Sequence, residues 1–332
     1  MGGEERVWNI ELREAEPVEE ELRAFVNEAR AGEGLEERSA EVWRWRAEAP
    51  GGAIVGSARD DAGELRAAVC VVRHPAILEG EVARFGEVVE VANAFAKGRG
   101  LVRAAPLAAL LEAFGRVYCG AAPEGMPFLY GVPTRRAHRF LRGRAKAEVL
   151  RAENVLWAQP SGLEWLETGV EVTESEGAPE ELDAFFMEWR RSKPAVLVRG
   201  RDEYAWRFRD HPTRSYRCAL ARRMGEVVGC AVLRMGEVDG EAGGILADWM
   251  TMPGDRECGM ELLRWAREAV GGTDRLFVNV SDRSGEFALF QSLGFRVRGT
   301  DEYLAFRGFR RPTVMSWLFA NWTYTLFDSE RG

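Results

Sequence analysis

The sequence predicts an α+β protein built from two similar halves, each with a sheet flanked by helices. Three observations lead to this prediction. The chain has 332 residues, more than a single hydrophobic core usually organises. Segments with the period-2 pattern of strands alternate along it with amphipathic helical segments. The order of these segments in the first half then recurs in the second, which indicates an internal repeat.

Composition limits the class of protein. The chain is 46% hydrophobic, as soluble globular proteins are, and no stretch reaches the ~18 uncharged apolar residues of a membrane span. The acidic N-terminus lacks the apolar segment of a secretory signal, so a cytoplasmic location is expected. The five scattered cysteines and three scattered histidines predict neither a disulfide framework nor a metal site. A net charge of −8 argues against a nucleic-acid binder.

In the first half, the sequence predicts elements in the order strand, two helices, three strands, helix, strand, helix and further strands. Pro17 opens the first helix, and Ser39 is the expected N-cap of the second. The cluster Asp60-Asp61-Ala62-Gly63 between two β-rich runs predicts a hairpin turn. The expected helices are residues 17–26, 39–45, 100–114 and 134–142, and the expected strands are residues 7–12, 54–59, 65–73, 88–91 and 128–132, with two more in 148–158.

Residues 85–114 carry the chemistry expected of this half. An apolar strand leads into the turn Lys97-Gly98-Arg99-Gly100, and a helix rich in Ala and Leu follows. Glycines in such a turn let backbone N–H groups approach an anion, and the positive end of the following helix favours phosphate there. The alternative is an ordinary connection between a strand and a helix, without a ligand.

This stretch resembles motif A of the GNAT (Gcn5-related) N-acetyltransferases, in which a basic residue or Gln followed by x-x-G-x-(G/A) holds the pyrophosphate of acetyl-CoA. Lys97 takes the first position and Gly100 the fourth, whereas Val102 stands where the family has Gly or Ala. The resemblance implies acetyl-CoA as acyl donor and a mixed, mainly antiparallel sheet flanked by helices. The cofactor-binding residues that it implies are Val91, Ala92, Asn93, Lys97, Gly98, Arg99, Gly100, Leu101 and Val102.

Four residues of the first half are candidates for proton transfer. Many GNAT enzymes carry on the fourth strand a carboxylate that deprotonates the amine, and Glu87 and Glu90 lie there. On a regular strand their odd spacing puts them on opposite faces, so without a bulge only one reaches the site. Glu90, nearer the loop, is the preferred base, and an exposed strand carboxylate is the alternative. Tyr130 in a strand and His138 in a helix are candidate acids, and either is equally a packing residue.

The second half repeats the order of elements, so the resemblance covers most of the chain and implies a tandem GNAT protein. The expected domains are 1–160 and 161–332, with a turn-rich break between them. The expected helices of the second half are 180–189, 201–209, 262–270 and 286–293, and the expected strands are 216–223, 227–235, 241–250 and 276–280, with the last strands opening at 294. The first two of these strands are expected to form a hairpin around Met224-Gly225-Glu226.

Cofactor binding is expected in the first half only. The second counterpart of motif A keeps Arg256 and Gly259 but has Glu261 where Gly or Ala belongs, and a carboxylate repels pyrophosphate. Phe290 stands where many GNAT enzymes have a tyrosine that protonates the CoA thiolate, and it has no proton to give. The alternative role for Phe290 is a core aromatic.

The sequence thus predicts an acyl-CoA-dependent N-acyltransferase, most simply one that transfers acetyl from acetyl-CoA to a small-molecule or peptide amine. Neither a nucleic acid nor a membrane is expected as partner. Two other functions stay open. One is a FemAB-like transferase, also built from two GNAT-like halves, which uses aminoacyl-tRNA and should show no CoA affinity. The other is a catalytically silent GNAT-like binding module.

Overall fold

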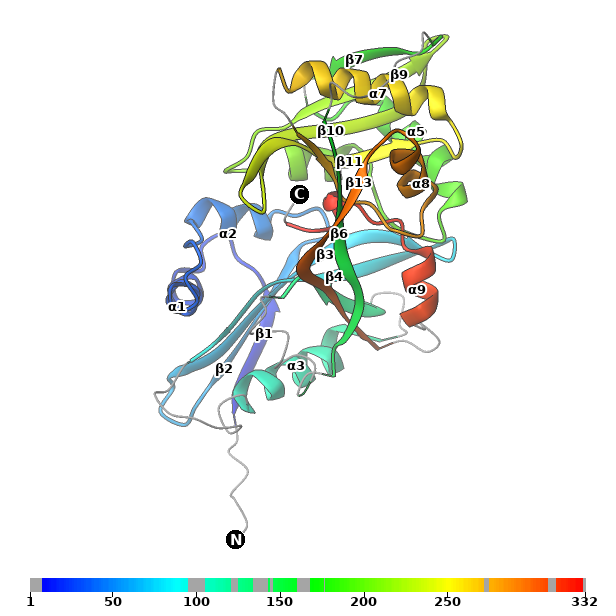
Figure 1. The fold of residues 1–332 in the computed structure, drawn as a ribbon. Helices are drawn as coiled ribbons and strands as arrows, with labels where there is room; N and C mark the ends of the chain where they lie inside the picture. The colour runs from blue at the N-terminus through cyan, green and yellow to red at the C-terminus, as the bar shows by residue number, and fades with distance from the viewer. Residues whose placement is uncertain are drawn as a thin grey trace. The chain divides into compact units, whose positions relative to one another are not determined.

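The computed structural model of the chain divides into two compact units (Figure 1). Each is a mixed sheet flanked by helices, as the sequence predicts. Unit 1 comprises Met1–Pro75, Ala83–Leu150 and Leu304–Val314, and unit 2 comprises Ala76–Val82, Arg151–Tyr303 and Met315–Gly332. The structure describes residues 8–94, 105–120, 125–133, 143, 146–159, 168–175, 177–271, 275–309 and 315–330.

Unit 1 follows the element order expected of the first half, except that the expected helix 134–142 lies outside the described residues. Its strands β1 to β5 are neighbours in sequence order; β1, β2 and β3 pair antiparallel, whereas β4 and β5 pair in parallel. The side chain of Ser39 accepts a hydrogen bond from the Val42 amide, which confirms the predicted cap of the second helix. The elements are β1 (Asn9–Glu14), α1 (Glu20–Ala31), α2 (Ala40–Ala47), β2 (Ala53–Arg59), β3 (Leu65–Leu78), β4 (Glu81–Asn93), α3 (Ala105–Tyr118) and β5 (Phe128–Gly131).

Helices cover both faces of the unit 1 sheet (Figure 1). On one face, Leu110 and Phe114 of α3 pack against Val69 of β3. On the other, Val26 of α1 and Trp43 of α2 belong to a cluster with residues of β2 and β3. Residues 67–72 of β3, between these two layers, are accordingly all apolar and buried, and a polar side chain in this part of the sheet requires a local partner.

Unit 2 repeats the pattern with a sheet in the order β6-β12-β11-β10-β9-β7, in which β11 and β12 are parallel. The α6 helix continues as a π-helical turn, Ala205–Arg209, and a 3₁₀ turn, Leu326–Asp328, lies near the end of the chain. The elements are β6 (Glu148–Ala158), β7 (Glu171–Ser175), α5 (Glu181–Trp189), β8 (Ala195–Leu197), α6 (Arg201–Tyr204), β9 (Arg217–Arg223), β10 (Glu226–Val238), β11 (Glu241–Thr251), α7 (Arg256–Ala269), β12 (Leu276–Val278), α8 (Gly285–Ser292), β13 (Arg296–Gly308) and α9 (Met315–Asn321).

Two tight turns set the register of the long hairpins in unit 2. Met224-Gly225 connects β9 to β10, and Asp239-Gly240 connects β10 to β11. All four residues have positive φ, between 52° and 86°, which is the backbone of a type I′ turn. The predicted hairpin at Met224-Gly225 is confirmed. Above these strands, Leu262 and Ala266 of α7 form part of the core.

Two expectations about strands were wrong. Residues 148–158 form the single strand β6 rather than two, because the segment contains no Gly or Pro at which the chain could turn. The last strands expected from Gly294 onward are likewise one strand, β13, whose residues 305–308 pair antiparallel with β5 of unit 1. Unit 1 thus takes a strand from the far end of the sequence.

Candidate functional site

Each unit has a long strand that pairs in parallel with its neighbour over a short stretch only. β4 continues to Asn93 and β11 to Thr251, well beyond the last paired residues. Beyond that point the backbone of each long strand has no register with this neighbour and must find other partners. The pairs are Gly86–Leu129 and Glu87–Tyr130 in unit 1, and Gly244–Leu276, Ile245–Phe277 and Leu246–Val278 in unit 2.

The second half of β4 departs from regular alternation. Val88 and Val91 both pack into the cluster that contains α3, and Val89 and Ala92 both pack into the cluster that contains α1 and α2. In a regular strand, residues three apart point to opposite faces. The alternation is therefore shifted by one residue between Val89 and Val91, which is the effect of a β-bulge.

This shift changes where the two candidate bases point. Glu87 precedes Val89 by two residues and shares its face, and Glu90 contacts Arg30 of α1 and Arg46 of α2. Both glutamates therefore lie on the face that α1 and α2 cover. The sequence predicts opposite faces for Glu87 and Glu90 only if the strand is regular. Because β4 contains a bulge, the two side chains lie on the same face instead.

Glu87 is buried beside a histidine of the neighbouring strand. His74 Nε2 lies 2.9 Å from Glu87 Oε2, and the two residues are 1% and 4% exposed. Tyr130 stands opposite Glu87 in the β4–β5 register, and its ring centroid is 6.5 Å from that of His74. A carboxylate, an imidazole and a phenol thus meet at the residue where the β4–β5 register ends. These are the side chains that enzymes use to move protons.

Glu90 is surrounded by three guanidinium groups. Its Oε1 accepts hydrogen bonds of 2.8 Å from Arg38 Nε and from Arg46 Nη2, and its Oε2 accepts one of 3.3 Å from Arg30 Nη1. Burial raises the pKa of Glu90, but the charges of Arg46, Arg38 and Arg30 outweigh burial and hold the pKa below its usual value. A carboxylate held in this way is a weak proton acceptor, so the geometry favours Glu87 over Glu90 as base.

The residues expected to bind the cofactor divide into two groups. The first group, at the end of β4 immediately after the bulge, is Val91, Ala92 and Asn93. The second group lies outside the described residues: Lys97, Gly98, Arg99, Gly100, Leu101, Val102 and the candidate acid His138.

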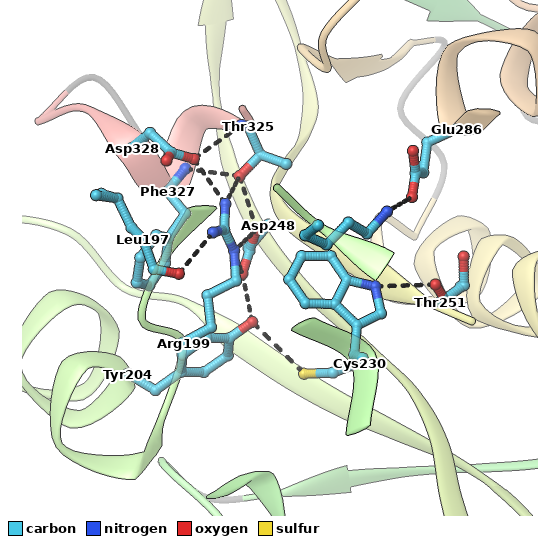
Figure 2. Close-up of polar contacts among 12 residues, drawn as sticks. Leu197, Arg199, Tyr204, Cys230, Asp248, Thr251, Glu286, Thr325, Phe327 and Asp328 are labelled. Atoms are coloured by element: carbon cyan, nitrogen blue, oxygen red, sulfur yellow. Dashed lines mark hydrogen bonds and ion pairs between the residues drawn. The ribbon is translucent and has the colours of Figure 1, made fainter. Parts of the chain in front are cut away.

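Unit 2 has a buried ionic network at the corresponding place (Figure 2). Arg199 donates to both oxygens of Asp248 at 3.2 Å and to Asp328 at 2.6 Å, and all three residues are fully buried. The hydroxyl groups of Thr325 and Tyr204 also donate to Asp248. Burial lowers the pKa of Arg199, but the charges of Asp248 and Asp328 outweigh burial and raise it. The network is a fixed ion cluster inside the unit.

Residues from elsewhere in unit 2 occupy the region where β11 has no register with β12. Thr325 forms an isolated antiparallel bridge with Val280, just after β12, and reaches β11 through Asp248. Trp189 of α5 donates its indole N–H to the Thr251 carbonyl at the end of β11, at 2.9 Å (Figure 2). The Thr251 carbonyl at the end of β11 is thus paired within unit 2, and the Asp248 side chain is held by Thr325.

The start of α7 is capped by an acidic side chain. Asp255 Oδ1 accepts a hydrogen bond from the Cys258 amide at 3.1 Å, and both its oxygens pair with Arg223. Glu261 is buried and accepts a hydrogen bond of 2.8 Å from Thr168. A phosphate at this helix end would meet the Asp255 carboxylate, so the site is unfavourable for pyrophosphate.

Phe290 and Gly259 have packing roles. Phe290 is fully buried, with its ring centroid 4.9 Å from that of Trp249 and 5.0 Å from that of Phe295, so it is the core aromatic of the alternative expectation. A Cβ added to Gly259 would lie 2.9 Å from Leu289 Cδ2, so close packing of α7 accounts for this glycine. Neither residue requires a cofactor to explain it.

His74 and the arginines around Glu90 were not predicted from the sequence. The position of His74 could have been inferred from the turn at Glu79-Gly80, whose two residues have positive φ. A two-residue turn sets Leu78 of β3 opposite Glu81 of β4, and this register brings His74 near Glu87. The arginines are separated from Glu90 by 44 to 60 positions in sequence, and no local pattern reports such a contact.

Neither a membrane-spanning helix nor a metal site is found among the described residues. None of their helices combines the length and apolarity that crossing a membrane requires. Within the same part of the chain, no group of three or more His, Cys, Asp and Glu side chains is arranged to hold a metal ion.

No protein-family profile and no curated protein matches this sequence. Solved structures match at low identity. A GCN5-related N-acetyltransferase from Anabaena variabilis has 12% identity, a TM-score of 0.63 and coverage of 90% of this chain and 72% of its own. A tandem GNAT protein from the clavulanic acid biosynthesis pathway has 13% identity, a TM-score of 0.54 and coverage of 90% and 98%. An N-myristoyltransferase of Saccharomyces cerevisiae with bound myristoyl-CoA has 11% identity, a TM-score of 0.53 and coverage of 92% and 84%.

These similarities concern the fold, and each spans nine-tenths of this chain. The repeated element order of the two units, and the short parallel register in each, agree with the fold that the resemblance of residues 85–114 implies. The chain is therefore a tandem GNAT-fold protein.

Proposed function

We propose that the protein is an acyl-CoA-dependent N-acyltransferase that works in unit 1, most simply by transferring acetyl from acetyl-CoA to a small-molecule or peptide amine. The observation that carries the proposal is the buried Glu87–His74 pair at the residue where the β4–β5 register ends. The donor class is supported by one fold neighbour, the N-myristoyltransferase solved with bound myristoyl-CoA.

The reaction needs a neutral amine, a proton acceptor and a stabilised oxyanion. The amine nitrogen attacks the thioester carbonyl carbon, the C–S bond breaks, and CoA leaves as a thiolate that takes up a proton. Glu87 receives the proton lost by the nitrogen, directly or through a water, and the 2.9 Å contact with His74 keeps its carboxylate oriented. Tyr130, opposite Glu87, is the candidate donor to the thiolate.

The bulge in β4 supplies the oxyanion contact. A bulge leaves one residue unpaired in the ladder, so its N–H can point at a ligand instead of a neighbouring strand. This supports an oxyanion donor among Val91, Ala92 and Asn93, directly after the shift. The loop that contains Lys97 and Gly100 then remains the proposed pyrophosphate site, on the strength of its sequence.

The contrast with unit 2 supports unit 1 as the working half. In unit 2 the Asp255 carboxylate already accepts a hydrogen bond from the backbone at the start of α7, where a pyrophosphate would otherwise bind. The unpaired end of β11 is occupied by Trp189, and Thr325 reaches the same strand through Asp248. A pyrophosphate and an acyl chain would have to displace these contacts. Unit 2 is accordingly proposed to be structural.

Thermal melting with acetyl-CoA tests the proposal. A ligand at ~100 times its dissociation constant adds roughly 2.7 kcal/mol to the free energy of unfolding, so acetyl-CoA should raise the melting temperature clearly. Gly100→Glu should abolish the shift, because it puts a carboxylate in the predicted phosphate loop. The control is Arg256→Glu at the start of α7 in unit 2, which should leave the shift intact.

An amine panel read by release of free CoA thiol then tests turnover. Release that depends on an amine supports the transferase. No melting shift with acetyl-CoA would contradict it and favour the aminoacyl-tRNA alternative. A shift without turnover of any amine would favour the silent binding module. Loss of the shift in Arg256→Glu alone would assign the cofactor to unit 2.

A further inference from the structure

The long strand of unit 2, β11, has the same one-residue shift as β4. In its pairing with β10 the register passes from Leu246 to Asp248, which leaves Ala247 as an extra residue. Leu246 and Trp249 are three positions apart, and because of the shift both belong to the cluster that contains α7. The two valines of β4 that flank its shift have the same relation to α3. The two units therefore share a bulge at the same place in the fold.

Each bulge contains one carboxylate, which is bound by an arginine that comes just before a helix. Arg38 directly precedes the N-cap of α2, and its Nε donates to Glu90 at 2.8 Å. Arg199 directly precedes the N-cap of α6, and its Nε donates to both oxygens of Asp248 at 3.2 Å (Figure 2). The two units thus have the same ion pair between the long strand and the start of a helix.

The sequence that follows these two arginines repeats as well. A buried tryptophan and a buried second arginine come seven and eight positions later, as Trp45-Arg46 in unit 1 and Trp206-Arg207 in unit 2. Arg46 also donates to Glu90, at 2.8 Å. The internal repeat of the chain therefore includes the ion pair. Since unit 2 is proposed to be structural, a bound substrate does not explain the ion pair in both units.

The polarity of β4 explains how the carboxylate fixes the bulge. Residues 88–92 are Val-Val-Glu-Val-Ala, so Glu90 alone in this run distinguishes an apolar face of the sheet from a polar one. In a regular strand Glu90 would share the face of Val88. It would then lie in the cluster of Leu110 and Phe114, where a carboxylate without a partner is strongly unfavourable. The one-residue shift turns Glu90 to the arginines instead.

The same reasoning applies to β11. Residues 245–250 are Ile-Leu-Ala-Asp-Trp-Met, again with a single charged side chain. Regular alternation from Leu246 would place Asp248 in the apolar cluster that contains Leu262 and Phe290. The shift places it beside Arg199. In both strands, the register with the bulge is thus the one that gives the carboxylate its arginine.

We infer that Glu90 is a positioning residue: its ion pairs with Arg38 and Arg46 select the bulge in β4, and the bulge presents the backbone N–H proposed to bind the oxyanion. Glu90 acts through the backbone and takes no part in proton transfer. The role of the N–H rests on the proposed function, whereas the selection of the bulge does not. The two parts are therefore tested separately.

Exchange of two neighbouring residues tests the selection of the bulge. In the double variant Glu90→Val/Val91→Glu, the carboxylate stands where a regular strand turns it toward the arginines. The variant should therefore fold without the shift. Its crystal structure should show the carboxylate at position 91 on the arginines and the side chain at position 90 in the α3 cluster. Glu90→Asp is the control, which should keep the shift, because an aspartate has this role in β11.

Two results would contradict the selection of the bulge by Glu90. A double variant that folds and keeps the shift would show that other contacts impose the bulge. A double variant that does not fold, under conditions in which Glu90→Asp does, would show that β4 has no regular register to adopt. Neither result depends on a ligand, so both can be obtained whether or not the protein binds acetyl-CoA.

Infrared spectra of bound acetyl-CoA, isotope-labelled at the carbonyl carbon, test the positioning. A hydrogen bond lowers the stretching frequency of the thioester carbonyl, so the band in the wild type and in Glu90→Asp should lie below that of free acetyl-CoA. The double variant should still bind acetyl-CoA, as its melting shift reports, but with the band near the free value. Thr325→Val in unit 2 is the control for lost stability and should keep the wild-type band.

Turnover gives a second measure of the positioning. With an amine from the panel, kcat of the double variant should be ~10²-fold or more below that of the wild type, the usual effect of losing an oxyanion donor, with little change in KM for acetyl-CoA. The deficit should be equal at each pH, because the base Glu87 is unchanged.

The outcomes distinguish the inference from the proposed function. A double variant that has lost the shift but keeps the wild-type band or the wild-type kcat would show that the bulge does not hold the oxyanion, and would overturn the positioning role. A wild type that does not bind acetyl-CoA would contradict the proposed function and the positioning role with it. The crystal structures would still decide whether Glu90 selects the bulge.

Discussion

Glu87 and Glu90 are three residues apart on one strand, yet their surroundings give the two carboxylates different properties. Glu87 has a histidine at 2.9 Å, whereas Glu90 accepts hydrogen bonds from three arginines. An ion pair with fixed cations favours the charged form of an acid, and an acid held charged does not take up a proton readily. Mutation of Glu87 is therefore expected to reduce turnover, whereas mutation of Glu90 is expected to reduce stability.

Glu87→Gln should lower turnover and leave cofactor binding intact. The amide keeps the size of the side chain but cannot accept the amine proton, so kcat should fall ~10²-fold or more if general base catalysis has its usual value. Release of CoA thiol gives the rate, and the acetyl-CoA melting shift gives the binding. Part of the loss should return at higher pH, where more amine is neutral. A variant that acetylates at the parent rate across pH would exclude Glu87 as base.

Glu90→Gln should affect stability first. Arg46 is 1% exposed in its side chain and would lose the buried charge of Glu90, a change that typically costs about 3 kcal/mol or more in the free energy of unfolding. Urea unfolding measures the loss. Glu28→Gln, an exposed glutamate of α1, is the control and should change little. Equal losses in the two variants would show that the three arginines do not depend on Glu90.

Glu203 in unit 2 predicts a pH dependence of stability. Burial raises its pKa to about 8, and its Oε1 meets no acceptor or donor among the described residues. In the unfolded chain a glutamate titrates near 4.3, so between about 4.3 and 8 the folded state holds a proton that the unfolded state releases. The stabilisation is complete below that range and is lost as the pH rises through about 8.

Glu203→Gln, which does not titrate, should remove this dependence. Its free energy of unfolding should vary less between pH 5 and pH 8 than that of the wild type, which falls by ~1.4 kcal/mol per pH unit at most. Unfolding in urea at four pH values measures both slopes. Parallel slopes would mean that Glu203 is charged in the folded protein.

At the scale of single residues, the sequence indicated candidate side chains but not the residues that contact them. Motif and strand position identified Glu87, Glu90 and Tyr130, because these properties are local. Which glutamate could act as base depended on a one-residue shift in β4 and on arginines from α1 and α2. Tertiary packing decides both, and packing has no short-range signature.

At the scale of elements, Thr325 connects the end of the chain to β11. Its hydroxyl donates to Asp248 at 2.7 Å and accepts from Arg199 at 3.2 Å and from the Phe327 amide at 3.1 Å. Thr325→Val keeps the shape but leaves these buried groups a partner short, so about 2 kcal/mol of unfolding free energy should be lost. Chemical denaturation measures it, and the acetyl-CoA shift should remain.

The matched control is Thr323→Val, two positions earlier. Thr323 is only partly buried and its side chain makes no hydrogen bond among the described residues. The same substitution there should cost a few tenths of a kcal/mol, the usual effect of a change at such a site. If both variants lose equal stability, the hydroxyl of Thr325 is not what holds the segment.

Elements with local signals were predictable and those without were not. The hairpin at Met224-Gly225 and the cap at Ser39 were predicted because a turn or a cap is specified by a few adjacent residues. β8, three residues long, has no period to detect. The end of β13 was misassigned because its partner β5 lies more than 170 positions earlier, and pairing at that distance leaves no pattern in either segment.

At the scale of the molecule, the exchange of segments predicts that the two halves do not fold alone. Fragment 1–160 lacks residues 305–308, which pair with β5, and fragment 161–332 lacks β6, which pairs with β12. Each fragment expressed separately should melt without a sharp transition, whereas co-expression should restore one. Cooperative melting of 1–160 alone, near the temperature of the full chain, would instead support the boundary near residue 160.

The same exchange constrains synthesis. A nascent chain that has emerged as far as β5 has one edge of that strand uncovered, and its antiparallel partner follows only after residues 151–303 of unit 2 have been translated. An open strand edge is a template for pairing with other chains. At a translation rate of ~5–20 residues per second, this exposure lasts roughly ten seconds or more. The ribosome-bound protein should thus need a chaperone over a defined interval of translation, which ends when residue 308 leaves the exit tunnel.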